Sequence, residues 1–506
     1  MKNAKVAKKL KYGSMAVVSM VIVIAIVIVV NIMMGVVEKR YPKAKLDLTK
    51  DKRFELCDES INVLKNLKKD VEIAVMYPEE TLLEYSYYNM IPKVMEKYEL
   101  YSKQSEGSVD VKYYDIQKDP DAVSKYKKYY NGDIAQGSVV VYCDGKVRVS
   151  NITNYITIDQ DAYYSTGEQN YIFIGESTIT SAIMSVADSN PKKAALLDRM
   201  GEGFVFSNNS YYNVIQLFSL LSSNGYEMEE LDVSDDFLDN DFDVIVIPAP
   251  EYDFTEDVIQ KLDDYLYNDG LYGRNVVYVS SPTATEIPNL KAFLDKWSIE
   301  IGDAFVSDDD SCIAATLSSA SQAVMSPKGE IADTDTVGEL PNSSLPIAVP
   351  YSRPVSIITR QNDVLTSMIL QSSASAYKAS FADLGTPSEE KGVEGFVVKT
   401  QRQRQDTQDQ FKVVSSNVVA FGSLMMFDPA VMGNTNAFNN ANFILNVFNS
   451  ITGKDASAVI PQKNLQDAVI KIDQKQVDGV RNVVVYIIPA VVVVCGIIVF
   501  IRRKNK

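Results

Sequence analysis

Apolar residues are concentrated in two long runs, one near each end of the chain. The first run covers residues 15–37 and follows a basic tip, residues 1–14, with five lysines and no acidic residue. The second run covers residues 482–501 and is followed by the basic tip 502–506. Each run has about the 20 residues that a helix needs to cross a bilayer. The pattern predicts a two-pass protein of the cell membrane, with both termini cytoplasmic and the main body extracytoplasmic.

Each apolar run is also compatible with a second interpretation. A cleaved signal peptide would explain the first run, but the run is long for such a peptide, and Glu38-Lys39-Arg40 follows it instead of a small-residue cleavage site. A buried core helix would explain the second run, but a Val- and Ile-rich segment of this length beside a basic end favours a membrane span.

Residues 47–160 show helix and strand patterns in alternation. Apolar residues between Leu56 and Leu67 recur at helical spacing, and Asp144-Gly145 is typical of a hairpin turn. Further helices are expected over residues 86–104 and 119–130, and strands over 71–77, 109–114, 138–143 and 146–150. This order predicts a first extracytoplasmic α/β domain, a small layer similar to thioredoxin-like arrangements but without their thiol motif.

Residues 171–453 continue the alternation on a larger scale. Residues 243–247 and 275–280 are continuous apolar runs of the kind found in buried parallel strands. Helices are expected over 213–224, 255–268, 290–301 and 440–452, and strands over 193–197, 226–233, 354–359, 364–368 and 413–421. The pattern predicts a second extracytoplasmic α/β domain, a doubly wound parallel sheet of amidotransferase-like order. Residues 372–412 are expected to form an exposed insertion, and residues 454–481 a polar connector to the second membrane helix.

Composition excludes several classes of function. The 506 residues include no histidine, which excludes histidine-based acid–base catalysis, Ser-His-Asp triads and histidine-bound metals. The four cysteines form no C-x-x-C pair, and free thiols are expected. Without the nine basic residues of the two ends, 41 basic residues face 66 acidic ones, a net charge of −25. An acidic body with basic ends argues against nucleic-acid binding.

Four residues are the strongest candidates for ligand or partner contacts. Glu176 and Ser177 stand at an expected helix start, and Arg199 and Glu202 follow an expected buried strand. Open α/β sheets bind ligands at the carboxyl ends of their strands. The structural alternative is that Glu176 and Ser177 cap the helix while Arg199 pairs with a nearby acid.

The sequence offers little basis for catalysis. Pro248-Ala249-Pro250 stands where a nucleophile elbow would be expected but carries no thiol, and Ser280-Ser281 has no histidine to activate it. We predict no catalytic residue, no cofactor and no metal site.

Two other groups of residues are interpreted as structural. The aspartates at 263–264 and 308–310 are expected to be solvated charge rather than metal ligands or glycosidase acids, because the second group lacks the spacing of a calcium loop. The tyrosines between residues 85 and 130 favour packing at helical spacing over the stacking of sugars.

Four passages, taken in order, carry a family resemblance. They are residues 47–49 with 64–67 and the strand at Val71; 175–183 running on to Pro191-Lys192; 224–226 leading to 243–250; and 418–423 and 439–446 with the C-terminal span and Arg502-Arg503. Together with the two terminal apolar runs, they resemble the GldG-like family, gliding-motility-type auxiliary components of ABC transport systems.

The chain departs from this family at two places. Where the family often has T-G-H-G-E, residues 198–202 are Asp-Arg-Met-Gly-Glu, so the histidine is missing. Where the family often has the acidic G-D-S-D-F, residues 422–426 are Gly-Ser-Leu-Met-Met. Any chemistry of those family segments is not expected here.

The resemblance implies a non-enzymatic, membrane-anchored accessory subunit that works beside an ABC ATPase and a multispan permease, with its body scaffolding or gating the permease. A second hypothesis is a stand-alone cell-surface receptor that binds an envelope glycan or peptide. A third, a degenerate hydrolase, has the least support because histidine and a nucleophile elbow are both missing.

Overall fold

The computed structural model describes the body of the chain in a series of segments. They are residues 26, 28–29, 53–158, 169–200, 203–204, 211–235, 241–282, 286–318, 322–340, 342–358, 363–381, 383–406, 412–454 and 459–465. The chain divides into two compact units, Met1–Asn464 and Leu465–Lys506, and the elements below all lie in the first. Apart from three positions, the two apolar runs lie outside the described residues, and no described helix is long and apolar enough to span a membrane.

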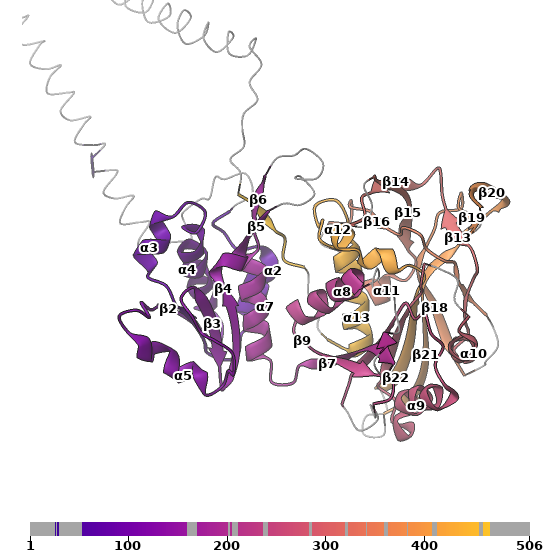
Figure 1. Cartoon of the computed structure of the whole chain (residues 1–506), viewed down its shortest axis with the longest axis horizontal. Helices are drawn as coiled ribbons and strands as arrows, with labels where there is room; N and C mark the ends of the chain where they lie inside the picture. Colours follow the sequence, from indigo (N-terminus) through magenta and orange to yellow (C-terminus); the bar gives the residue numbers. More distant parts are fainter. Residues whose placement is uncertain are drawn as a thin grey trace, which may run out of the picture. The chain divides into compact units, whose positions relative to one another are not determined.

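The first domain is built on a four-stranded sheet in the order β2-β1-β3-β4 (Figure 1). The strands are β1 (Val71–Val75), β2 (Val109–Tyr113), β3 (Ser138–Cys143) and β4 (Lys146–Asn151). β1 runs parallel to β2 and antiparallel to β3, which forms a hairpin with β4. Asp144 and Gly145 have φ values of 48° and 86°, as the predicted tight hairpin turn requires.

The helices of the first domain include the predicted ones and one over residues 79–84 that was not predicted. They are α2 (Asp58–Lys65), α3 (Glu79–Glu84), α4 (Met90–Ser102), the 3₁₀ turn η2 (Pro120–Val123) and α5 (Ser124–Lys127). The helix expected over residues 119–130 is therefore shorter and begins as a 3₁₀ turn.

Helix α7 (Gly175–Ala187) packs against β3 and β4 of the first sheet. The sequence analysis placed this helix in the second domain. Ile179, Ile183 and Val186 are its buried apolar residues, and their spacing predicts a helix with one buried face. Such a pattern does not indicate which sheet covers that face.

Two strands that precede α7 in the sequence and one from near residue 463 form a small antiparallel sheet. Its strands, in the order β23-β6-β5, are β5 (Ile156–Ile158), β6 (Tyr171–Phe173) and β23 (Lys463–Asn464). The 3₁₀ turn η3 (Ile152–Tyr155) leads into β5. β23 comes from the far end of the described chain, so this sheet joins segments that are almost 300 residues apart.

The second domain contains an eleven-stranded sheet whose centre is parallel (Figure 1). Its strands are β7 (Lys192–Met200), β8 (Gly203–Phe204), β9 (Tyr226–Asp232), β10 (Val244–Pro248), β11 (Asn275–Val279), β14 (Cys312–Ala315), β15 (Val324–Ile331), β16 (Ile347–Ala348), β18 (Leu365–Gln371), β21 (Gly395–Gln405) and β22 (Val413–Phe421). β9, β7, β10, β11 and β22 are parallel neighbours in that order. From β21 outward the neighbours are antiparallel, so the sheet is mixed rather than wholly parallel.

The helices of this domain match the periodic segments closely. The longer ones are α8 (Tyr211–Ser223), α9 (Glu256–Tyr267), α10 (Pro288–Lys296) and α13 (Asn440–Thr452), and the short ones are η4 (Asn268–Gly270), α11 (Thr334–Val337), η5 (Leu424–Phe427) and α12 (Pro429–Met432). The helix expected over residues 290–301 ends early because Ser298 has a φ of 61°, and β12 (Ile299–Ile301) follows.

Residues 372–412 are not the exposed insertion that the sequence analysis expected. β21 lies between β18 and β22, and its residues Phe396, Val397 and Val398 are fully buried. Elsewhere in this region β19 (Tyr377–Ser380) and β20 (Asp383–Lys391) form a smaller sheet with β13 (Phe305–Ser307), and β17 (Val355–Ile357) pairs with β12. The prediction was wrong because the second half of β21 is polar, which made the whole segment look exposed although its first half is buried.

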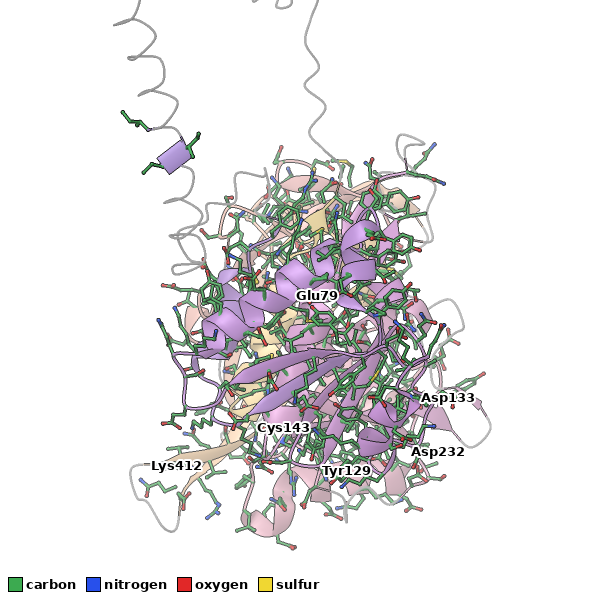
Figure 2. The ribbon with its side chains drawn as sticks, turned by 90° about the vertical axis from the view of Figure 1, so that its left-hand side faces the viewer. Glu79, Tyr129, Asp133, Cys143, Asp232 and Lys412 are labelled. Carbon is green, nitrogen blue, oxygen red and sulfur yellow. The ribbon has the colours of Figure 1, made fainter. Side chains whose placement is uncertain are left out.

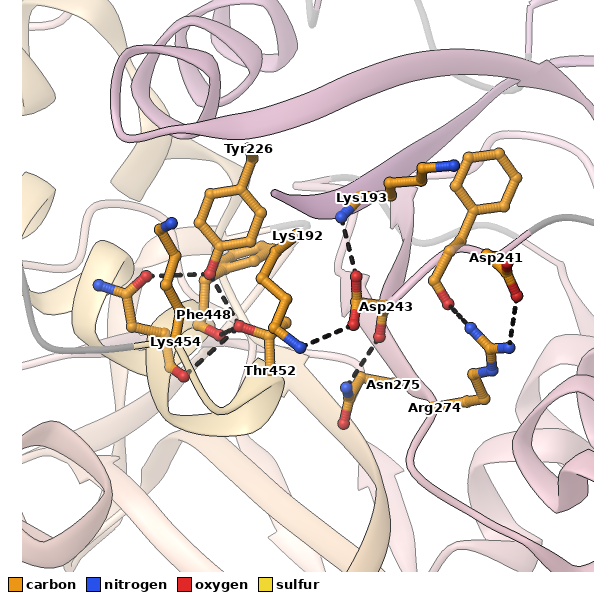
Figure 3. Close-up of polar contacts among 12 residues, drawn as sticks. Lys192, Lys193, Tyr226, Asp241, Asp243, Arg274, Asn275, Phe448, Thr452 and Lys454 are labelled. Carbon is orange, nitrogen blue, oxygen red and sulfur yellow. Dashed lines mark hydrogen bonds and ion pairs between the residues drawn. The ribbon is translucent and has the colours of Figure 1, made fainter. Parts of the chain in front are cut away.

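Polar contacts join the amino ends of the parallel strands (Figure 3). The Lys192 Nζ lies 2.9 Å from the Asp243 carboxylate, and Asn275 donates a 2.8 Å hydrogen bond to the Asp243 carbonyl. The Tyr226 hydroxyl donates to Asn449 of α13 at 2.9 Å. These contacts pair polar groups at the amino edge of the sheet. Sheets of this kind bind ligands at the opposite, carboxyl edge.

Candidate functional site

The first position of helix α7 has no room for a side chain. A Cβ at Gly175 would lie 2.5 Å from the Phe173 ring and 2.8 Å from the Tyr155 ring. Both rings are buried and meet edge to face. Glycine therefore lets the helix begin directly against these two rings, and the next residue, Glu176, lies inside the domain rather than at its surface.

Glu176 is a buried acid with a buried cation as its partner. Its side chain is 1% exposed, and Oε2 lies 2.5 Å from the Nζ of Lys463, whose side chain is 6% exposed. Oε1 accepts a 2.8 Å hydrogen bond from the backbone N–H of Cys57. Removing two ions from water costs several kcal/mol each unless a close partner and hydrogen bonds compensate. The amino end of α7 adds a field that favours the carboxylate.

Buried hydroxyl groups surround this ion pair. The Tyr98 hydroxyl donates to the Glu176 carbonyl at 2.9 Å and lies 2.5 Å from the Thr180 hydroxyl, which is 3.0 Å from that of Ser60. The Cys57 sulfur caps α2 by accepting from the Ser60 N–H. Burial raises the pKa of Tyr98 and of Cys57, and the Glu176 charge raises both further. Both groups are neutral near pH 7, and the Cys57 thiol is a poor nucleophile.

Lys463 also joins the two ends of the described body. Its Nζ donates to the backbone carbonyl of Glu55 and lies 3.5 Å from that of Arg53. Its backbone pairs with Phe173 in the β23–β6 ladder. We call this group of contacts the terminal clasp, formed by Glu55, Cys57, Glu176 and Lys463. The clasp fastens the segment that follows the first apolar run to the segment that precedes the second.

A groove of about 690 Å³ lies next to the clasp, and Ser177 lines it. Its walls come from α2, α7, α8, α12 and α13 and from residues 224, 339, 433, 435, 459, 460 and 462, and all of its lining residues belong to the compact unit Met1–Asn464. The volume falls within the range of about 300–1,000 Å³ typical of ligand sites. The groove and the clasp share helix α7, which positions Ser177 in one and Glu176 in the other.

The structure places two of the four predicted residues at this site. Glu176 does not cap α7, as the structural alternative supposed, because Ile174 is the capping residue and makes no side-chain cap bond. The Ser177 hydroxyl donates to the Ile174 carbonyl at 2.8 Å. Arg199 lies in β7, where its backbone pairs with β8 and β9. Glu202 lies outside the described residues.

The residues of the site that were missed include Glu55, Cys57, Tyr98 and Lys463. The two acids after Cys57 are a weak signal for a helix start, which would have indicated a capping role. Tyr98 was predicted only as part of a helical pattern. Lys463 has no local signal, because a lysine in a polar connector looks like a solvated charge.

At the carboxyl edge of the parallel strands, the turn after β10 stands where a nucleophile elbow would be expected, but it carries no nucleophile. Ala249 follows β10 with a φ of 44°, a conformation that a nonglycine residue adopts only under constraint. Its side chain has no nucleophilic atom. Ser280 and Ser281, after β11, are buried. Within the described residues, no group of three or more acids and cysteines is placed to hold a metal ion.

Among the aspartates at 308–310, Asp309 and Asp310 are exposed, as expected of solvated charge, but Asp308 is not. Asp308 is buried, and its carboxylate accepts hydrogen bonds from the hydroxyls of Ser373 and Ser375 at 2.6 and 2.7 Å. Burial alone would raise its pKa, but these bonds and two backbone N–H groups outweigh burial and lower the pKa. Asp308 is therefore a structural acid that ties two loops together.

Some tyrosines of the first domain have the predicted packing role, and others are exposed. Tyr98 and Tyr126 are fully buried, whereas Tyr129 lies at the surface with 40% of its area exposed (Figure 2). Cys57, Cys143 and Cys312 are free thiols, as expected. Burial raises the pKa of Cys143 as well.

Comparison with known proteins matches parts of the chain. Residues 50–159 match a family model described as "Domain of unknown function (DUF7088)". No curated protein matches the chain.

Two solved structures show a distant likeness. The mmIFT52 N-terminal domain is 12% identical, with a TM-score of 0.35 over 52% of this chain and 98% of its own. A structure described as a GMP synthase component from Thermoplasma acidophilum is 9% identical, with a TM-score of 0.25 over 53% of this chain and 94% of its own. At these scores the likeness carries no argument about function.

Proposed function

We propose that this protein is a non-enzymatic, membrane-anchored accessory subunit of an ABC-type transport or export complex, and that its extracytoplasmic body scaffolds or gates the permease. The observation that supports this proposal best is the terminal clasp, in which Lys463 binds both Glu176 and the backbone of Glu55. If helices at both ends anchor the body in the membrane, the two ends of the body are expected to lie close together, and the clasp holds them together.

The stretches between the clasp and the apolar runs are short. Residues 38–52 precede the described body and residues 466–481 follow it, so each stretch has about 15 residues. At ~3.3–3.6 Å per residue, a fully extended stretch of this length reaches roughly 50 Å. In the proposed topology, lipid surrounds both helices and both basic tips lie in the cytoplasm.

The proposed architecture is a thioredoxin-like layer followed by an amidotransferase-like sheet. The order β2-β1-β3-β4, with α7 packed on the hairpin, supports the first part. The parallel order β9-β7-β10-β11-β22 supports the second. The resemblance to the GldG-like family, carried in part by residues 175–183 of α7, supports the proposed partners, an ABC ATPase and a multispan permease.

Co-purification of the full-length protein in mild detergent tests the proposal. We expect an ABC ATPase and a multispan permease, identified by mass, to be recovered with the tagged chain in a fixed ratio. The variant Lys463→Met, which removes the cation of the clasp, should lower the recovery of the permease several-fold.

A matched control separates this effect from a general loss of lysine. Lys412 is an exposed residue beside β22 in the second domain (Figure 2), and Lys412→Met should leave the ratio unchanged. Recovery of the chain without an ATPase and permease would contradict the proposal.

A further inference from the structure

The groove beside the terminal clasp is rich in uncharged hydrogen-bonding groups. Ser177 and Ser181 line it from α7, and Ser219 and Ser223 line it from α8. In each pair the two serines are one helical turn apart, so each helix presents a continuous polar stripe. Amide side chains extend the polar lining: Asn62, Gln216, Asn224, Asn446 and Gln462.

Apolar side chains share the walls with these polar groups. They include Ile61, Val63, Met184, Leu220, Met432 and Ile460. A wall of this mixed kind suits a polypeptide in extended conformation. The hydroxyls of Ser177 and Ser181 and the amides of Asn224 and Asn446 donate to backbone carbonyls of this chain, so it is their oxygens that can accept the main-chain N–H groups of a peptide. The apolar side chains of the walls can contact its alternate side chains.

The charges at the groove indicate the charge of its ligand. Asp58, Glu59 and Glu339 line it together with one cation, Lys65, which leaves a net charge of −2. Asp58 and Glu339 are exposed, so their carboxylates are available to a partner. Complementary charge favours a partner with lysine or arginine side chains.

We propose that this groove binds a short basic peptide segment of another protein, in extended conformation. A glycan fits the lining less well, because sugar rings are commonly held against aromatic faces and no aromatic side chain lines the groove in the described part of the chain. The cavity volume of about 690 Å³ suits a short peptide segment rather than a folded domain. The proposal goes beyond the accessory-subunit role, since it assigns a ligand class to a defined surface.

Isothermal titration calorimetry on the full-length protein in mild detergent tests the proposal. The probe is the acetylated and amidated hexapeptide KVKAKV, with EVEAEV as the peptide of opposite charge and chitohexaose as the sugar competitor. We expect saturable binding of KVKAKV that weakens as salt is added, no binding of EVEAEV, and no displacement by chitohexaose.

Two variants locate the binding in the groove. Ser219→Trp fills the groove from an exposed position of α8 and should weaken binding at least tenfold, whereas Ser222→Trp, exposed on the same helix but outside the lining, should leave it unchanged. The triple variant Asp58→Asn, Glu59→Gln and Glu339→Gln should weaken binding about tenfold and remove most of its salt dependence. If Ser219→Trp does not fold, the triple variant still provides the test.

Four results would overturn the proposal: no binding of KVKAKV, equal binding of EVEAEV, equal affinity of the Ser219→Trp and Ser222→Trp variants, or displacement by chitohexaose. The titration needs no ABC transporter component, so its failure leaves the proposed function untouched. Conversely, the loss of co-purifying components would say nothing against peptide binding.

Discussion

Two carboxylates of the first domain, Glu176 and Glu72, bind lysine in opposite surroundings. Glu72, on β1, lies 2.8 Å from the Nζ of Lys112 and of Lys125, whose side chains are 43% and 50% exposed. Glu176 lies 2.5 Å from Lys463, whose side chain is 6% exposed. Water can replace the partners of Glu72, but it cannot reach the pair at the clasp.

Burial decides what each of these pairs is worth. At Glu72, burial alone would raise the pKa, but hydrogen bonds from Lys112, Lys125 and Tyr126 outweigh it and lower the pKa to about 2. The two lysine side chains are about half exposed, so water and salt screen the pair, and it is typically worth about 1 kcal/mol or less, which is below what the lowered pKa alone implies. The Glu176 pair gains little from its own formation because both ions are desolvated, yet breaking it leaves a buried charge. The clasp therefore determines where the chain ends are held more than how stable the domain is.

The largest effect is expected from Lys463→Met. This change leaves the Glu176 carboxylate buried without its cation, and the free energy of unfolding should fall by about 3–5 kcal/mol. Denaturant unfolding of the full-length protein in mild detergent, followed by circular dichroism, measures it.

The double variant Glu176→Met with Lys463→Met is the control for that experiment. It removes both charges and should recover most of the lost stability. A loss below about 1 kcal/mol in the single variant would contradict the account of the clasp as a desolvated ion pair.

A smaller loss is expected from Gly175→Ala, which tests the packing at the clasp without changing charge. The new methyl group would meet the rings of Phe173 and Tyr155, and overpacking of this kind costs about 1–3 kcal/mol. Gly392→Ala is the matched control, because nothing lies within 4 Å of a Cβ there, and it should stay within about 0.5 kcal/mol of the unmodified protein. Equal melting temperatures for the two variants would argue against tight packing at the amino end of α7.

Glu72→Gln tests the solvent-accessible pair for comparison with the buried pair of Glu176 and Lys463. Its loss of unfolding free energy should be about 1 kcal/mol or less and should shrink as salt is added. Denaturant unfolding at low and high ionic strength measures both features. A loss as large as that of Lys463→Met would mean that burial is not what separates the two pairs.

The smallest effect is the acid sensitivity of the Glu72 pair. Because the pKa of Glu72 is lowered from 4.5 to about 2 on folding, its contribution is complete above the unfolded value and disappears as the pH falls toward 2. Glu72→Gln has no titrating group there, so its melting temperature should fall less steeply than that of the unmodified protein across this range. Parallel melting curves would show that other acids account for the acid sensitivity.

Local pattern predicted the elements whose signals lie within their own sequence. Helix α13 has the predicted bounds, Asn440–Thr452, and ends at Gly453, whose φ of 65° is left-handed as a terminating glycine requires. The continuous apolar run of β10 is buried throughout and parallel to both neighbours. In both elements the buried face, the start and the stop are encoded within about a dozen residues.

Local pattern failed where the partner of an element lies far away in the chain. β21 needed β18 and β22 on its two sides before Phe396 and its neighbours could be recognised as core. Helix α7 shows one apolar face, but only the folded chain decides that β3 and β4 cover it. The same limit applies to Glu176, which was chosen as a candidate for its position at a helix start, because its ion-pair partner, Lys463, lies far away in the sequence.

For this protein the sequence by itself determined the alternation of helices and strands, the absence of histidine chemistry, the acidic body between basic ends, and the helix on which Glu176 and Ser177 lie. Tertiary structure alone decided that Glu176 is buried beside Lys463 and that Ser177 lines a groove. The physical reason is range. Apolar periodicity acts between residues a few positions apart, whereas the partner of a buried charge can be any residue that the fold brings within a few ångströms.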